Sequence, residues 1–253
     1  MKNQYKTLEL AIKKIGAHAQ DIRSSGLSVI TKSRQDFVSK ADLSVEDELK
    51  KVISTLFPED GFLGEESGLT EGISKENIWV IDPIDGTTNY LQGMDYWCIS
   101  VAYIVKGKIE VGFIYAPDRN EFFFAEHGQG AYLNDEPLEI NEPEEGHAII
   151  GVGRSNRRPL SEYLSLLTIL DEKNIEHRRF GAGALMLAHV SSGLVHGYYE
   201  SHLNSWDALA GLLLIQEAGG KASSFLEGDG LLTGDSVWAG SPKLWDDLKE
   251  LLQ

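Results

Sequence analysis

The stretch Trp79-Val-Ile-Asp-Pro-Ile-Asp-Gly-Thr-Thr-Asn-Tyr90 decides how the rest of the chain is interpreted. Residues 78–81 form a short apolar run, partly β-branched, which predicts a buried strand. Pro83 has no N–H group to donate and is expected to end the strand ladder. Residues 86–89 then favour the start of a helix or a tight turn. The stretch is therefore predicted to be a core strand that ends in an acidic bend.

Two carboxylates, Asp82 and Asp85, flank this bend. Carboxylates three residues apart around a bend can point at a shared metal pair, and the free N–H groups of a helix start favour an anion. Asp, Pro and Gly are also common turn residues, so an acidic turn without chemistry is the alternative interpretation. The stretch alone leaves both interpretations open.

Composition narrows the class of protein. The chain has 253 residues, enough for one large domain or two tightly joined halves. Its net charge of −16 argues against nucleic acid or an anionic membrane as a partner, although bound divalent cations would still allow an anionic substrate. The single cysteine, Cys98, lies in an apolar run, which predicts a buried thiol and a reducing cytoplasm. No apolar run approaches the roughly 18–20 residues that span a bilayer.

Periodicity predicts an alternation of helices and strands. Helices are expected at 4–24, 45–56, 160–170, 181–191, from Trp206 to the glycine pair 219–220, and at 243–252. Strands are expected at 62–63, 98–105, 110–115, 121–125, 148–152, 175–180, 194–200 and 237–239, with an antiparallel meander across 97–133. Residues 32–39 are expected to form a polar loop, and residues 139–146 are the most loop-like interior stretch.

Further carboxylates stand at the ends of these elements. Asp42 lies just before the second helix, where helix capping is the alternative role. Glu65 and Glu66 follow a short strand and should point to opposite faces. Asp207 lies in the first turn of an apolar helix, where it would also complement the helix dipole. Oxygen donors favour Mg²⁺ over Zn²⁺, and Mg²⁺ among carboxylates suggests metal-assisted phosphoryl chemistry.

Three motifs match a known family. Gly64-Glu-Glu-Ser67, Trp79-Val-Ile-Asp-Pro-Ile-Asp-Gly-Thr-Thr-Asn89 and Trp206-Asp207…Glu217-Ala-Gly-Gly220 resemble the inositol monophosphatase family, within the lithium-sensitive, Mg-dependent phosphatase superfamily. The resemblance runs from about 32 to 220, and three motifs in register are far more specific than one. It implies an α/β fold of alternating helix and sheet layers, like that of fructose-1,6-bisphosphatase, in one domain over 1–253 with lobes at roughly 1–140 and 141–253.

The resemblance also implies metal ligands. Glu65 and the backbone carbonyl of Ile84 would bind a first metal, Asp82 would bridge two metals, and Asp85 and Asp207 would bind the second. The cofactor implied is Mg²⁺, about two or three ions per active site.

Catalytic and phosphate-binding roles follow from the same resemblance. Thr87 and Asp42 would orient and deprotonate the attacking water, with Glu65 counted among the catalytic residues. Gly86 and Thr87 would offer backbone N–H groups to the phosphate. Direct hydrolysis by a metal-activated water is implied, without a covalent phosphoenzyme.

Substrate contacts are implied more loosely. Glu200 would accept hydrogen bonds from inositol hydroxyls, Gly183 would offer a backbone contact, and Ser155 would face the ring. The loop 153–159 holds three arginines that either face an anionic ligand or are solvated. Lys32 would lie on a mobile loop beside the site.

The sequence therefore predicts a cytoplasmic, homodimeric, lithium-sensitive hydrolase that converts inositol monophosphate to inositol and phosphate. Its partner would be a small phosphorylated polyol, with no nucleic acid and no membrane. The alternatives are the same chemistry on histidinol phosphate, fructose-1,6-bisphosphate, NADP or 3'-phosphoadenosine 5'-phosphate, or a regulatory binding protein that retains the fold.

Overall fold

The computed structural model describes residues 3–25, 29–33, 36–70 and 74–249. The helices in this part of the chain are α1 Asn3–Ser24, α2 Lys40–Leu56, α3 Thr87–Leu91, α4 Leu160–Glu172, α5 Gly183–Ser191, α6 Ser205–Glu217, α7 Gly230–Thr233 and α8 Pro242–Lys249, with a 3-10 turn at Pro117–Arg119. The strands are β1 Val29–Ser33, β2 Asp36–Ser39, β3 Asp60–Gly64, β4 Gly68–Leu69, β5 Ser74–Asp85, β6 Cys98–Val105, β7 Lys108–Ala116, β8 Glu121–Glu126, β9 Ala131–Leu133, β10 Glu136–Pro137, β11 Ile149–Val152, β12 Glu176–Arg178, β13 Gly197–Leu203, β14 Lys221–Ala222 and β15 Asp235–Gly240.

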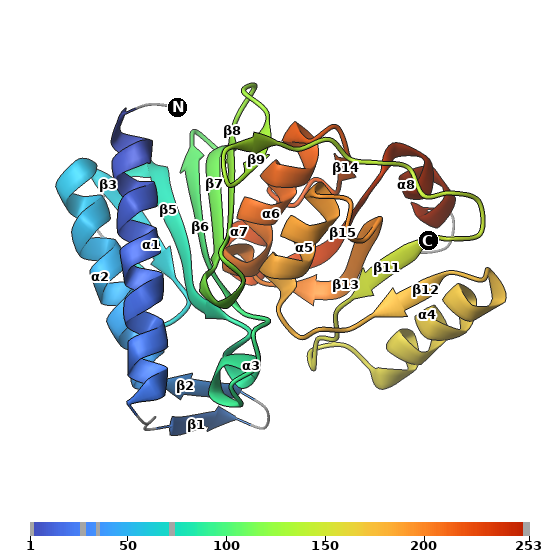
Figure 1. Ribbon diagram of the computed structural model, residues 1–253, viewed down its shortest axis with the longest axis horizontal. Helices are drawn as coiled ribbons and strands as arrows, with labels where there is room; N and C mark the ends of the chain where they lie inside the picture. The colour runs from blue at the N-terminus through green and yellow to red at the C-terminus, as the bar shows by residue number, and fades with distance from the viewer. Residues whose placement is uncertain (1–2, 26–28, 34–35, 71–73, 250–253) are drawn as a thin grey trace.

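Within the described residues these strands form three sheets (Figure 1). The eight-stranded sheet has the order β10-β9-β8-β7-β6-β5-β3-β4, and the five-stranded sheet has the order β12-β11-β13-β15-β14. The third sheet is the β1–β2 hairpin. The meander is confirmed, because β6, β7, β8 and β9 pair in sequence and antiparallel. β5 departs from this pattern, since it pairs parallel with β3 and antiparallel with β6.

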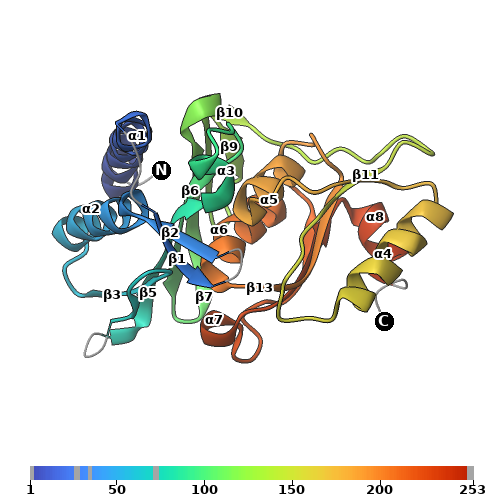
Figure 2. The same ribbon diagram turned by 90° about the horizontal axis from the view of Figure 1, so that it is seen from below.

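Helices and sheets alternate in layers (Figures 1 and 2). α1 and α2 cover one face of the eight-stranded sheet, while α5 and α6 pack between its other face and the five-stranded sheet. α4 and α8 lie on the outer side of the five-stranded sheet. The layered α/β fold predicted from the sequence is confirmed.

Burial on both faces explains why the central elements are so apolar. Every residue of β6 except Val105 is buried, because helices cover the sheet on both sides. α6 is apolar around most of its circumference, as expected for a helix enclosed between two sheets. Since α6 contacts strands of both sheets, the division of a single domain into lobes at 1–140 and 141–253 stays a prediction.

Three predictions about local structure were wrong. The loop expected at 32–39 contains parts of the β1–β2 hairpin, in which Ile30 pairs with Val38 across the strands. α2 begins at Lys40, so Asp42 lies inside its first turn rather than before it. Pro83 does not end β5, because the strand continues to Asp85 through a register shift between Asp82 and Asp85. An irregularity of this kind tolerates a residue without an N–H group.

None of the helices in the described ranges combines the length and the apolar character needed to cross a membrane.

Candidate active site

Four carboxylates meet at one end of β3 and β5. Asp82 and Asp85 come from the irregular end of β5, and Asp207 comes from the first turn of α6. One oxygen from each of these three side chains lies within 4.8 Å of the other two. Glu65 follows β3, whose last residue pairs with Ile81 of β5, so Glu65 comes beside Asp82. The parallel β3–β5 pair and α6 therefore bring together acids that are up to 142 positions apart in the chain.

Burial and mutual repulsion shift the pKa values of these acids upward. Burial raises the pKa of Asp82 well above its usual range, and the charge of Glu65 raises it further. Burial raises the pKa of Glu65 in the same direction, with the charge of Asp207 next in importance. The pKa of Asp207 is also raised by burial. Burial and the charge of Asp207 raise the pKa of Asp85 to about 7. A cation is what would allow all four groups to be ionised together, and this all-carboxylate donor set fits a hard ion such as Mg²⁺.

Asp85 is tied to the start of α5. The N–H groups of Gly183 and Leu185 donate to its two carboxylate oxygens at 3.0 and 3.1 Å. The Cys98 thiol donates to the same carboxylate at 3.5 Å, and Cys98 is buried, as predicted. The N–H of Gly183 is thus already engaged, and the predicted substrate contact of Gly183 stays a prediction.

The bend after Asp82 is stabilised from within. The N–H of Ile84 donates to Asp82 Oδ1 at 2.9 Å, and the carbonyl of Ile84 accepts from Thr87 Oγ1 at 3.1 Å. Gly86 follows with φ at 86°, and a methyl group there would lie 2.9 Å from the Cβ of Ala182. The close approach of α5 and the left-handed backbone both require glycine at this position.

The predicted water-activating pair is brought together. Thr87 Oγ1 lies 3.4 Å from Asp42 Oδ1, although the two residues are 45 positions apart. Asp42 is fully buried. Asp42 lies in the first turn of α2, whereas an N-cap residue precedes the helix. Helix capping therefore does not describe the role of Asp42.

A residue that sequence reasoning missed supports the Glu65 turn. Glu46 of α2 is buried, accepts a hydrogen bond from the N–H of Glu66 at 2.9 Å, and pairs with Lys50 at 3.0 Å. Glu46 lies one helical turn after Asp42, so the spacing of the two acids was the available signal.

Replacing Gly64 by alanine should destabilise the protein and weaken metal binding, because the added methyl group would lie 2.6 Å from the Glu46 carboxylate. We expect a loss of about 1–3 kcal/mol in the free energy of unfolding, the usual result of overpacking. Urea unfolding and Mg²⁺ titration would measure the two effects. The double variant Gly64→Ala with Glu46→Asp, which shortens the carboxylate arm, should recover part of the stability. Wild-type stability in Gly64→Ala itself would contradict this account of the Glu65 turn.

Glu200 lies on the five-stranded sheet. It is 8% exposed, and its Oε2 accepts a hydrogen bond from the Tyr198 hydroxyl at 2.6 Å. Burial raises the pKa of Glu200 to about 7. The run Tyr198-Tyr199-Glu200 was the reason to favour an inositol-type polyol over a nucleotide bisphosphate, and the position of Tyr198 two residues before Glu200 places both on the same face of the strand.

The three arginines of the loop 153–159 have different surroundings. Arg157 lies 3.0 Å from His202 Nε2, and Arg158 pairs with Glu162 at 2.9 Å. Arg154 lines a cavity of about 760 Å³ together with Arg179 and other side chains. Ser155 Oγ accepts the N–H of Arg157 at 3.2 Å, a contact within the loop.

Lys32 lies in β1, and its side chain is outside the described residues. The partner strand β2 packs beside α2 and α3 (Figure 2).

Residues 1–252 match the family model described as the inositol monophosphatase family. The chain belongs to this family. Members of the family are metal-dependent phosphatases that act on small phosphorylated substrates.

Individual members of the inositol monophosphatase family resemble the chain over most of its length. It is 36% identical over 233 residues to the inositol-1-monophosphatase of Caulobacter vibrioides, covering 90% of this chain and 91% of the relative. It is also 36% identical over 233 residues to the Nus factor SuhB of Pasteurella multocida, covering 91% and 86%. The crystal structure of the extragenic suppressor protein suhB from Bartonella henselae superposes with a TM-score of 0.89 at 32% identity, covering 96% of each chain.

Proposed function

We propose that this member of the inositol monophosphatase family is a Mg²⁺-dependent phosphomonoesterase that hydrolyses inositol monophosphate to inositol and phosphate. The convergence of Asp82, Asp85 and Asp207 oxygens within 4.8 Å is the observation that carries the proposal. Membership of the inositol monophosphatase family supports phosphoryl chemistry at this carboxylate centre.

The proposed metal ligands are those that the family resemblance implies. Glu65, Asp82 and the Ile84 carbonyl would hold one ion, while Asp82, Asp85 and Asp207 would hold another. When bound, Mg²⁺ lowers the pKa of water and neutralises charge on a phosphoryl group. About two or three ions per site are proposed.

Thr87 and Asp42 would handle the proton of the attacking water. The Thr87 hydroxyl has one proton and two acceptors within reach, the Ile84 carbonyl at 3.1 Å and Asp42 Oδ1 at 3.4 Å. By donating to one acceptor, Thr87 presents its lone pairs to a water molecule. Asp42 is then the base of the pair, and the backbone N–H groups of Gly86 and Thr87 would bind the phosphate.

Glu200 would select a polyol. Its Oε2 accepts from the Tyr198 hydroxyl, and Oε1 is the atom proposed to accept from a substrate hydroxyl. Ser155 and Gly183 are proposed as further substrate contacts, and Lys32 as a residue beside the site.

Glu200→Gln should lower kcat/KM for inositol 1-phosphate by roughly 10- to 100-fold, because a hydrogen bond to a charged acceptor contributes about 1.5–3 kcal/mol. The comparison substrate is p-nitrophenyl phosphate, which has no hydroxyl for Glu200 to bind. Its hydrolysis should change by less than about threefold. An equal loss on both esters would assign Glu200 to the chemistry rather than to substrate choice.

The decisive test of the proposed function is phosphate release from inositol 1-phosphate, with and without Mg²⁺, beside histidinol phosphate, fructose-1,6-bisphosphate, NADP and 3'-phosphoadenosine 5'-phosphate. Fast Mg²⁺-dependent release from the inositol ester alone is the expected result. Faster release from another ester would keep the mechanism and replace the substrate.

A second candidate is a regulatory protein that retains the fold, and the name of the Pasteurella relative, Nus factor SuhB, favours it. Asp85→Asn separates the candidates. Loss of hydrolysis together with a retained cellular role would assign the chain a second function, which would also reopen the prediction that it has no nucleic-acid partner.

The homodimer, lithium sensitivity and cytoplasmic location stay predictions from the family resemblance. Sedimentation, Li⁺ titration of phosphate release and cell fractionation would test them in turn.

A further inference from the structure

Asn89 ends the motif that carries Asp82 and Asp85, yet the chemistry proposed above gives it no role. Its side chain is 8% exposed. The amide nitrogen donates to two backbone carbonyls, those of Tyr96 and Phe180, each at 2.7 Å. A single buried nitrogen thus binds two segments that lie 7 and 91 positions away in the sequence.

These segments carry parts of the candidate active site. Asn89 itself lies in α3, which begins at Thr87, and Phe180 precedes the turn that leads into α5. The first N–H groups of α5 donate to Asp85, just before α3. Asn89 and Asp85 therefore connect α3 and α5 from two sides, and both connections must hold if Thr87 and Gly183 are to keep their separation.

An asparagine suits this place for a chemical reason. Its amide group supplies two N–H donors on one nitrogen and carries no charge. Aspartate has the same shape but, when ionised, only accepts hydrogen bonds. It would leave both carbonyl oxygens unpaired and would face them with negative charge.

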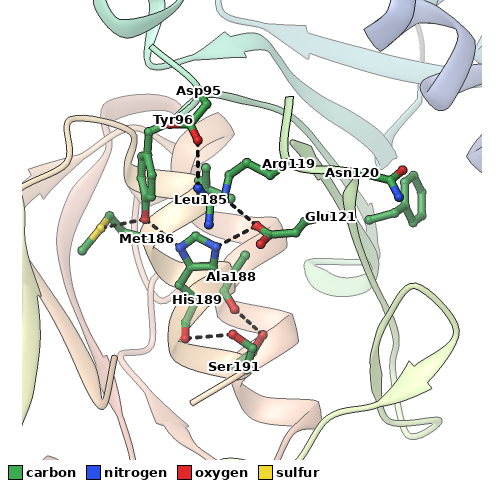
Figure 3. Close-up of polar contacts among 12 residues, drawn as sticks. Asp95, Tyr96, Arg119, Asn120, Glu121, Leu185, Met186, Ala188, His189 and Ser191 are labelled. Carbon is green, nitrogen blue, oxygen red and sulfur yellow. Dashed lines mark hydrogen bonds and ion pairs between the residues drawn. The ribbon is translucent and has the colours of Figure 1, made fainter. Parts of the chain in front are cut away.

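Tyr96, whose carbonyl accepts one of the two Asn89 hydrogen bonds, also contacts α5 through its hydroxyl (Figure 3). Its hydroxyl lies 2.8 Å from Nδ1 of the buried His189, and His189 Nε2 lies 2.9 Å from Glu121 Oε2. Glu121 also accepts from Arg119 Nε at 3.0 Å, and Arg119 pairs with Asp95 at 3.2 Å.

The direction of the hydrogen bond between His189 and Glu121 follows from charge. His189 and Arg119 lower the pKa of Glu121 against the effect of its burial, so the carboxylate is ionised and can only accept. His189 Nε2 must therefore carry a proton. Tyr96 thus holds α5 through its hydroxyl and α3 through its carbonyl.

We propose that Asn89 is a positioning residue for α3 and its Thr87 hydroxyl beside the carboxylate centre, and that the Tyr96–His189–Glu121 chain holds one of the carbonyls to which Asn89 binds. The inference rests on the proposed phosphatase function. Asn89 borders the cavity that Arg154 and Arg179 line, and it is proposed to act by fixing α3 against α5.

The first test is Asn89→Asp, assayed at 25 °C on the substrate that the wild type hydrolyses. We expect kcat/KM to fall by about 100-fold, the usual cost of a displacement of about 1 Å at a reacting centre. The affinity for Mg²⁺, measured by calorimetry, should change less than about twofold, because the metal ligands keep their own hydrogen bonds.

Tyr96→Phe covers the case in which Asn89→Asp fails to fold. It keeps the ring and the carbonyl and removes the hydroxyl, with its contacts to His189 Nδ1 at 2.8 Å and to Met186 Sδ at 3.0 Å, so a loss of about tenfold in kcat/KM is expected. Tyr132→Phe is the matched control, because its hydroxyl bonds to Gln129 at 3.0 Å on the exposed side of β9. His189→Gln, whose amide keeps a donor and an acceptor, should retain more activity than His189→Leu.

The outcomes separate the two proposals. Lowered melting temperatures with wild-type kcat/KM in Asn89→Asp or Tyr96→Phe would overturn the positioning role and leave the phosphatase function standing. Equal losses in Tyr96→Phe and Tyr132→Phe would do the same. Absence of hydrolysis by the wild type on every ester would overturn both.

Discussion

Replacing Asp82 by asparagine should abolish phosphate release and, in the absence of metal, make the protein more stable. Asp82 is 2% exposed and faces the charges of Glu65, Asp207 and Asp85. The amide oxygen of asparagine can still accept the N–H of Ile84, so the bend keeps its hydrogen bond at 2.9 Å. Asparagine avoids the cost of either protonating Asp82 or burying it as an anion beside three other acids, and we expect a gain of about 1–3 kcal/mol in metal-free protein.

The activity of Asp82→Asn should fall, although its stability without metal should rise. Asp82 is proposed to hold both ions, and its loss should lower kcat/KM by about 1,000-fold or more, equivalent to about 4 kcal/mol. Phosphate release, Mg²⁺ calorimetry and thermal unfolding in EDTA would measure the activity, the Mg²⁺ affinity and the stability of the variant. Asp60→Asn is a matched control, because Asp60 is also buried but accepts from Trp79 Nε1 at 3.0 Å at the other end of β3. An unfolded Asp82→Asn would show that Asp82 is structural and would weaken the metal assignment.

Metal-free protein should lose stability as the pH rises from about 4 to about 7. The pKa of Asp85 is raised from 3.8 to about 7, and that of Glu200 from 4.5 to about 7. Both groups are therefore protonated more easily in the folded state than in the unfolded chain. Their contribution to stability is complete below the unfolded pKa values and is lost as the pH rises through the folded ones. For Asp85 alone this contribution amounts to about 4 kcal/mol.

Thermal unfolding in EDTA at pH 5, 6, 7 and 8 measures this dependence, and the melting temperature should fall across the series. Saturating Mg²⁺ should reverse the fall at pH 8, because the ions neutralise the carboxylates that otherwise repel one another. Asp85→Asn and Glu200→Gln should each flatten the pH dependence, whereas Asp60→Asn should keep it. A melting temperature that rises with pH in EDTA would contradict the raised pKa values.

Much of the fold followed from local sequence pattern. The apolar run at 98–105 predicted β6 with its observed bounds, and the helical spacing at 4–24 predicted α1 within a residue of its start. The pattern failed where pairing or irregularity decides. Thr31 and Phe37 pair across the β1–β2 hairpin in a stretch of polar composition. Pro83 remains within β5 only because the register shifts around it, which no local rule specifies.

The residues of the candidate site likewise include some that the sequence predicted and some that only the structure shows. The motifs identified the carboxylates, since acids at the ends of adjacent parallel strands and at a helix start can meet. Contacts that support them were missed because they join distant segments. Asn89 meets Phe180 across 91 positions, and Cys98 meets Asp85 across a strand pair. In the sequence Glu46 is one of several charged residues on an amphipathic helix. Its supporting role is seen only where α2 packs against the Glu65 turn.

The proposed metal ligands and the proposed substrate contacts lie on different parts of the fold. The acids of the candidate metal centre belong to β5, the end of β3 and α6, whereas Glu200 and Ser155 belong to β13 and the loop after β11. On the roles proposed for Glu200 and Ser155, mutations in the five-stranded sheet would change the substrate contacts while the proposed metal ligands stay in place. A lineage with this architecture would then exchange one phosphate ester for another through drift in a single layer, and a protein engineer would begin in that layer too.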